Sequence, residues 1–166
     1  MIKINPKNYI SENIISEEEL IKKLVELRKQ GKKIGLCTGS FDLLHPGHIA
    51  HLISAKKACD VLVVAIARDN YSSKTRGKGR PIFSQYLRAF MVSQLKSVDF
   101  VIFDDRLDKI NRVIKPDVYI KGRDYSDGRE KLQEEIVSSY GGKIYYTPTE
   151  KLSTTKIIRY IKEEVL

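Results

Sequence analysis

The sequence predicts an α/β protein, a Rossmann-like five-stranded parallel sheet with helices on both faces. Short apolar or β-branched runs alternate with segments of helical spacing along the chain, which favours a parallel sheet. The run Val61–Ala67 is apolar without interruption, as is typical of a strand covered on both faces. The length of 166 residues indicates one domain.

Helices are predicted where apolar residues recur at helical spacing between terminal signals. Ser16 and Gly31 bound the first, Pro46 suits the first turn of the second, and Ser153 is an N-cap for the last. The predicted helices cover residues 16–31, 46–58, 84–95, 107–114, 129–140 and 154–165. The predicted strands cover residues 32–39, 60–67, 99–103, 117–122 and 143–147.

The ends of the chain and its cysteines bear on domain organisation and location. We expect residues 1–15 to form a loosely packed arm and residues 16–166 to form a single domain. Cys37 and Cys59 lie in apolar surroundings, as buried thiols in a reducing compartment do. The start of the chain lacks the apolar core of a signal peptide, and its longest apolar run is too short for a bilayer. These features predict a cytoplasmic protein with no membrane partner.

The net charge of +9 indicates either a solvated basic surface or a polyanionic ligand. Nucleic acid is not the favoured ligand, because basic residues are not interleaved with stacking aromatics. The densest basic cluster, KTRGKGR at residues 74–80, is short enough for a loop that grips phosphate.

Polar residues concentrate where the predicted strands end. In parallel sheets, ligands bind beyond the carboxyl ends of the strands, at the point where strand order reverses. The candidate windows are therefore residues 39–48, 68–80, 104–106, 121–125 and 147–155.

All three histidines, His45, His48 and His51, fall within seven positions around Pro46-Gly47. Three interpretations compete for them. They could make local hydrogen bonds at a helix start, or form a three-histidine zinc site, although no cysteine or acidic ligand lies beside them. In the third interpretation, the free N–H groups and partial positive charge of a helix N-terminus bind a phosphate, with two imidazoles as further donors. The motifs of P-loop enzymes and dinucleotide dehydrogenases do not occur in the sequence.

Two motifs carry a resemblance to a known family. GSFDLLHPGH, residues 39–48, resembles the signature of the HxGH nucleotidyltransferases of the cytidylyltransferase-like superfamily, and LSTTKII, residues 152–158, resembles its second motif. The resemblance covers roughly residue 30 to the end of the chain. It implies transfer of a nucleoside monophosphate from ATP or CTP to a phosphorylated sugar or polyol, with release of pyrophosphate. It also implies Mg²⁺ bound with the triphosphate, and a homodimer is possible because dimers are common in that family.

The resemblance also assigns roles to individual residues. His45 and His48 would stabilise the reacting α-phosphate, with Lys74 and Arg76 as further catalytic residues on a mobile loop. The triphosphate would lie at Ser153, Thr154 and Thr155. The remaining residues expected to bind the nucleotide are Gly39, Ser40, Phe41, Asp42, Gly47, Arg88, Lys121, Gly122 and Asp124.

The finer resemblance is to the adenylyltransferase domain that makes ADP-heptose from heptose 1-phosphate. The segments RGKGRPI, residues 76–82, and IKPDVYIKGRDY, residues 114–125, carry it, although Arg123 and Ser40 stand where that subgroup has Gly and Cys. Glycerol 3-phosphate cytidylyltransferases are the alternative, but the Arg-Thr-Glu-Gly run that they carry is Pro148-Thr149-Glu150-Lys151 in this chain. A nucleotide-binding module without turnover is a further alternative.

Overall fold

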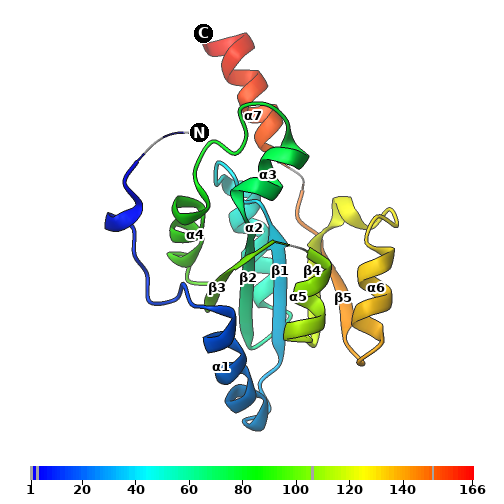
Figure 1. Cartoon of the computed structure of the whole chain (residues 1–166). Helices are drawn as coiled ribbons and strands as arrows, with labels where there is room; N and C mark the ends of the chain where they lie inside the picture. The colour runs from blue at the N-terminus through cyan, green and yellow to red at the C-terminus, as the bar shows by residue number, and fades with distance from the viewer. Residues whose placement is uncertain (1, 3, 106, 151) are drawn as a thin grey trace.

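The computed structural model describes residues 2, 4–105, 107–150 and 152–166. Its centre is one parallel five-stranded sheet of strand order β3-β2-β1-β4-β5 (Figure 1). The strands are β1 (Ile34–Gly39), β2 (Val61–Ala67), β3 (Phe100–Asp104), β4 (Val118–Gly122) and β5 (Lys143–Thr147). The predicted fold class and all five strands are thus confirmed, with ends that differ by at most two residues.

Helices cover both faces of the sheet. On one face, α2 (Pro46–Lys56) and α4 (Gln85–Ser93) bury Leu52 and Val92. On the other face, the apolar sides of three helices pack against the strands. These helices are α1 (Glu17–Lys29), α5 (Leu107–Ile114) and α6 (Lys131–Ser138). Ser16 is the N-cap of α1, and its hydroxyl accepts a hydrogen bond from the Glu19 N–H at 3.1 Å.

Strand order reverses between β1 and β4. From β1 the chain moves outward through β2 and β3, then returns to the other side of β1 to form β4 and β5. The chain segments that follow β1 and β4 therefore diverge at the carboxyl edge of the sheet, which opens a crevice there.

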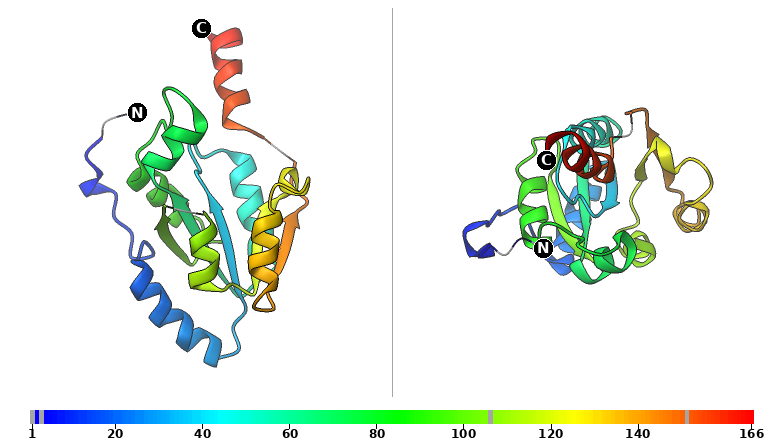
Figure 2. Two further views of the ribbon diagram at one scale, coloured as in Figure 1. Left: turned by 45° about the vertical axis from the view of Figure 1, so that its right-hand side comes forward. Right: turned by 90° about the horizontal axis from the view of Figure 1, so that it is seen from above.

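Three further elements lie at this edge. They are helix α3 (Asp69–Arg76), the 3₁₀ turn η2 (Arg123–Tyr125) and helix α7 (Thr154–Tyr160), which continues as the π-helix η3 (Ile161–Val165). Figure 2 shows α7 and η3 extending away from the body of the molecule. Helix α3 corrects our expectation of a mobile loop at this place, since Lys74 and Arg76 lie in its last turns.

Part of the N-terminal segment is fixed to the sheet, whereas we expected loose packing throughout. The N–H of Val101 in edge strand β3 donates to the Asn13 carbonyl at 2.8 Å, and the N–H of Ile15 donates to the Val101 carbonyl at 3.0 Å. Ahead of these residues come the 3₁₀ turn η1 (Pro6–Asn8) and Tyr9, whose ring packs edge-on against Phe90. Within the described residues, no helix combines the length and apolar character needed to cross a membrane.

Candidate active site

A cavity of about 220 Å³ lies at the carboxyl edge of the sheet, at the reversal point of the strand order. Its walls come from the segments after β1, β4 and β5 and from the first turns of α2 and α7. The predicted site residues that line it are Gly39, Ser40, Phe41, Asp42, His45, Gly47, His48, Lys121, Gly122, Asp124, Ser153, Thr154 and Thr155. The two sequence motifs, more than 100 residues apart, therefore face the same cavity.

His45 and His48 line the cavity at the N-terminus of α2. Their rings stack with centroids 3.7 Å apart and planes 19° apart. His45 is the N-cap of α2, and its Nδ1 accepts a hydrogen bond from the His48 N–H at 3.4 Å. Pro46 follows at the first helical position, where no N–H is lost.

The protonation of His45 follows from this arrangement. Burial lowers the pKa of His45, and the hydrogen bond to its own backbone only partly offsets that effect. The ring is therefore neutral near pH 7, and because Nδ1 accepts, the ring proton lies on Nε2. Among the described residues, this buried Nε2 has no hydrogen-bond partner. The site thus holds an N–H donor ready for a ligand oxygen, beside the positive end of α2.

Gly47 allows the two motifs to approach. A Cβ built at this position would lie 2.9 Å from Cβ of Leu152 and 3.2 Å from Cε1 and Nδ1 of the His45 ring. Contacts this short require the neighbouring atoms to move.

We therefore expect Gly47→Ala to lower kcat/KM by about tenfold, because small displacements of catalytic groups are costly. Alanine alone favours a helix more than glycine does, so any loss must come from crowding of His45 and Leu152. Steady-state kinetics of the purified variant checks this. Unchanged kinetics would mean that the spacing of the two motifs tolerates a methyl group.

Asp42 ties three segments of the site together. Its carboxylate accepts hydrogen bonds from the N–H groups of Ile82 and Phe83 at 2.9 and 3.2 Å and forms an ion pair with Arg80 at 2.7 Å. Its main-chain carbonyl accepts from the Thr154 hydroxyl at 2.8 Å. The side chain thus holds the 80–83 segment in place, and the main chain anchors the start of α7.

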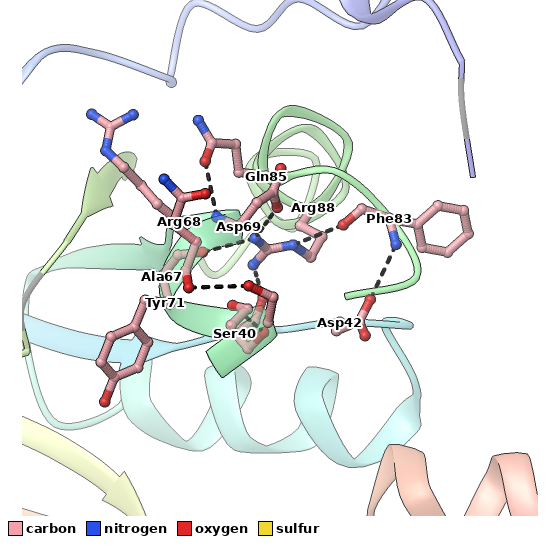
Figure 3. Close-up of polar contacts among 12 residues, drawn as sticks. Ser40, Asp42, Ala67, Arg68, Asp69, Tyr71, Phe83, Gln85 and Arg88 are labelled. Atoms are coloured by element: carbon pink, nitrogen blue, oxygen red, sulfur yellow. Dashed lines mark hydrogen bonds and ion pairs between the residues drawn. The ribbon is translucent and has the colours of Figure 1, made fainter. Parts of the chain in front are cut away.

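Arg88 does not line the cavity. Its side chain has no solvent exposure, and Figure 3 shows the polar contacts that its guanidinium makes with the surrounding segments. It donates to the carbonyls of Ser40, Ala67 at 2.7 Å and Phe83 at 3.1 Å, and pairs with the Asp69 carboxylate at 2.8 Å. Arg88 therefore supports the wall of the site from behind, by joining the ends of β1 and β2 to α3 and α4.

Another predicted residue is not brought to the cavity. Lys74 is an exposed residue of α3 and does not line the cavity. The side chain of Arg76 lies outside the described part of the structure, as does the whole of Arg106 from the third predicted window. What α3 does supply is Ser72, whose hydroxyl lies 3.0 Å from that of Ser40.

Lys121 is buried beneath the cavity at the end of β4. Its Nζ lies 3.4 Å from the Glu130 carboxylate, 3.3 Å from the Thr38 hydroxyl and 4.6 Å from the ring centroid of Tyr125. Burial acts to lower the pKa of Lys121, but Tyr119, Glu130 and Tyr125 outweigh it and the pKa is raised. Lys121 therefore stays positively charged in a site suited to an anion.

Several residues that line the cavity were not predicted individually, although all of them except Thr38 and His51 lie within the candidate windows. They are Thr38, His51, Arg80, Tyr125, Thr149, Glu150 and Leu152. Arg80 is the last residue of the basic cluster at 74–80. The cluster therefore points to the cavity, although Arg80 lines it and Lys74, the first residue of the cluster, does not. For His51 the sequence suggested a role only as the third ligand of a zinc site.

The structure contradicts that three-histidine zinc site. Nδ1 of His51 lies 2.8 Å from the Thr147 hydroxyl on β5, while His45 and His48 stack on each other. No group of three histidine, cysteine or acidic side chains in the described ranges could hold a metal ion.

His51 makes folding sensitive to acid. Burial, then the charge of Lys121, lower the pKa of His51 from 6.5 to about 4, against an opposing effect of Asp124. Since the folded pKa lies below the unfolded one, the unfolded state binds more protons between pH 6.5 and 4, and stability falls as the pH falls through this window. We expect His51 to account for about 3 kcal/mol of this loss by pH 4.

Urea denaturation at pH 7, 5.5 and 4.5 measures this effect. The variant His51→Gln is expected to show a correspondingly shallower fall in the free energy of unfolding. The same pH dependence in both proteins would rule out His51 as the source.

Comparison with known proteins agrees with the geometry of the site. Residues 36–160 match the model of the family described as cytidylyltransferase-like. The chain belongs to the cytidylyltransferase-like family. The family resemblance on the sequence motifs is thus confirmed, and the protein is a nucleotidyltransferase.

Two curated relatives carry the name "Bifunctional protein HldE". The protein of Desulfatibacillum aliphaticivorans is 43% identical over 148 residues, and that of Alcanivorax borkumensis is 36% identical over 154 residues. These alignments cover 87% and 91% of this chain but only 30% and 32% of the relatives. The chain therefore spans about a third of the length of these proteins.

Among the solved structures that resemble this chain, two have the following similarity. The lipopolysaccharide core biosynthesis protein from Thermoplasma volcanium is 34% identical, with a TM-score of 0.63, and the match covers 73% of this chain and all of that one. A pantoate-beta-alanine ligase from Francisella tularensis has a TM-score of 0.60 over 92% of this chain and 77% of its own, at 18% identity, and shares the fold.

Proposed function

We propose that this protein transfers AMP from ATP to a sugar 1-phosphate of the heptose 1-phosphate type and releases pyrophosphate. The observation that carries the proposal is the meeting of the HxGH histidines, the first turn of α7 and the cation of Lys121 around one cavity. The resemblance to the ADP-heptose-forming domain, the relatives named HldE, and the Thermoplasma protein named for lipopolysaccharide core biosynthesis support this choice of substrate.

The reaction is an in-line displacement at the α-phosphorus. A phosphate oxygen of the acceptor forms the new bond to this phosphorus, the bond to the bridging oxygen of the β-phosphate breaks, and pyrophosphate leaves with the electron pair. No covalent enzyme intermediate is needed, because the nucleophile is already an anion. The protein contributes mainly by positioning and by electrostatic stabilisation.

The residues of the cavity divide this task. The Nε2 of His45, His48 and the first turn of α2 stabilise the charge on the α-phosphate as it redistributes. Ser153, Thr154 and Thr155 bind the outer phosphates at the start of α7. Lys121 attracts the phosphate of the acceptor.

Mg²⁺ is expected to enter with the triphosphate, held mainly by phosphate oxygens and water. The donor set suits this role, since carboxylate oxygens, which Mg²⁺ and its bound water prefer, line the cavity. When bound, the ion would neutralise charge on the triphosphate. Asp124 and Glu150 are the carboxylates at the cavity, besides Asp42, that could hold water of its shell.

A pyrophosphate-release assay tests the proposal. ATP and CTP are each combined with heptose 1-phosphate, other sugar 1-phosphates and glycerol 3-phosphate, in the presence of Mg²⁺. We expect release with ATP and the heptose phosphate above all other pairs. Release with CTP and glycerol 3-phosphate would favour a cytidylyltransferase, and nucleotide binding without release for every acceptor would favour a binding module.

A further inference from the structure

His51 lies in the second turn of α2, where the helix faces β5, and it lines the cavity. Its Nδ1 is 2.8 Å from the hydroxyl of Thr147, which has no solvent exposure. That hydroxyl also lies 3.2 Å from the Thr149 hydroxyl and 3.4 Å from the Lys121 carbonyl. The orientation of the imidazole is thus fixed from behind, by groups at the carboxyl ends of β4 and β5.

A fixed orientation leaves one ring nitrogen for a ligand. The Thr147 hydroxyl is hydrogen-bonded to Nδ1 of His51. Among the described residues, this leaves Nε2 as the ring nitrogen that can bind a ligand in the cavity. The lowered pKa of His51 keeps the ring neutral at physiological pH. Other groups of the cavity already serve the phosphates, His45 and His48 at the start of α2 and the cation of Lys121 at the end of β4, so the His51 nitrogen is left for an uncharged group.

We propose that His51 is a specificity-determining residue that binds an uncharged polar group of a substrate through Nε2. This inference rests on the proposed function and assigns a role within the same site. Two groups have the required chemistry, a hydroxyl of the acceptor sugar and the polar edge of the nucleobase. Both are uncharged, and both distinguish one substrate of this reaction from another.

The alternative is a purely structural role, in which His51 only joins α2 to β5. Two variants separate the two roles. His51→Phe keeps a ring of similar size but removes both nitrogens. Thr147→Val removes the anchoring hydroxyl at constant shape, while Nε2 of His51 is retained. If His51 only anchored the helix, the two variants would have the same consequences.

The experiment measures substrate affinity in three proteins: the unchanged chain, His51→Phe and Thr147→Val. Calorimetry gives the Kd of ATP and of purine riboside triphosphate, which lacks the 6-amino group, without an acceptor present. Steady-state kinetics gives the KM of the sugar phosphate at saturating ATP. Thermal unfolding confirms that the variants are folded.

Loss of one hydrogen bond of this kind is expected to weaken binding by about tenfold. If Nε2 binds the base, the Kd of ATP rises about tenfold in His51→Phe, and the variant no longer prefers ATP to the purine analogue. If it binds the acceptor, the KM of the sugar phosphate rises about tenfold at unchanged Kd of ATP. In either case Thr147→Val should show the smaller effect.

The inference is overturned if a folded His51→Phe keeps both affinities within twofold, or if Thr147→Val reproduces its whole effect. Failure of the proposed function is a different result. In that case the unchanged protein binds ATP but releases no pyrophosphate with any acceptor, and the Kd values of ATP and of purine riboside triphosphate still test whether His51 binds the base.

Discussion

Replacing His48 by alanine is expected to lower kcat/KM by about a hundredfold, because a donor to the transition state is worth roughly 3 kcal/mol. The His48 ring lies in the cavity wall, stacked on His45 and 5.4 Å from the ring centroid of Phe41. The main-chain N–H that bonds His45 is kept in the variant. The loss should therefore appear in turnover rather than in folding.

Pyrophosphate release and circular dichroism measure the two consequences separately. Ile53→Ala is the matched control, since Ile53 lies on the same helix and is 49% exposed. His45→Asn is a useful companion, because asparagine retains an N-cap for α2 but not the Nε2 donor. Turnover within threefold of the unchanged protein in His48→Ala would remove His48 from the mechanism.

Replacing Arg88 by methionine is expected to destabilise the protein by about 3–5 kcal/mol, since it removes a buried cation from a partly buried carboxylate and from three main-chain carbonyls. The variant would leave the Asp69 carboxylate without this partner. It would also leave the carbonyls of Ser40, Ala67 and Phe83 without their donor. Because Ser40 lines the cavity, turnover should fall together with stability.

Urea denaturation gives the change in the free energy of unfolding. Arg112→Met, at an exposed position on α5, is the control for loss of an arginine as such. Arg88→Lys should recover only part of the loss, because one ammonium cannot reach all the acceptors that the planar guanidinium serves. A loss below 1 kcal/mol in Arg88→Met would show that the network of Figure 3 contributes little to folding.

The sequence predicted the sheet well because its signals are local. Uninterrupted apolar runs, such as Val61–Ala67, mark strands covered on both faces, and the caps Ser16 and Ser153 mark helix starts. The same holds for the two motifs at the cavity, whose residues are adjacent in sequence. The cytoplasmic location, the homodimer and the absence of a nucleic-acid partner stay predictions.

What the sequence did not predict depends on contacts between distant segments. Helix α3 has no buried apolar stripe; the bond of Ser72 to Ser40 and the contacts of Asp69 with Gln85 and Arg88 hold it instead. An arginine at helical spacing looks like a surface residue, so the burial of Arg88 could not be foreseen. The role of His51 likewise depends on Thr147, 96 positions later.

The most direct test of the account is an experimental structure with a non-hydrolysable ATP analogue and Mg²⁺. The account predicts the α-phosphate within about 3 Å of Nε2 of His45 and of the His48 side chain, with the outer phosphates at Ser153, Thr154 and Thr155. A triphosphate that lies away from the two histidines or away from Ser153, Thr154 and Thr155 would contradict it. So would histidine side chains that point away from the α-phosphate in the bound state.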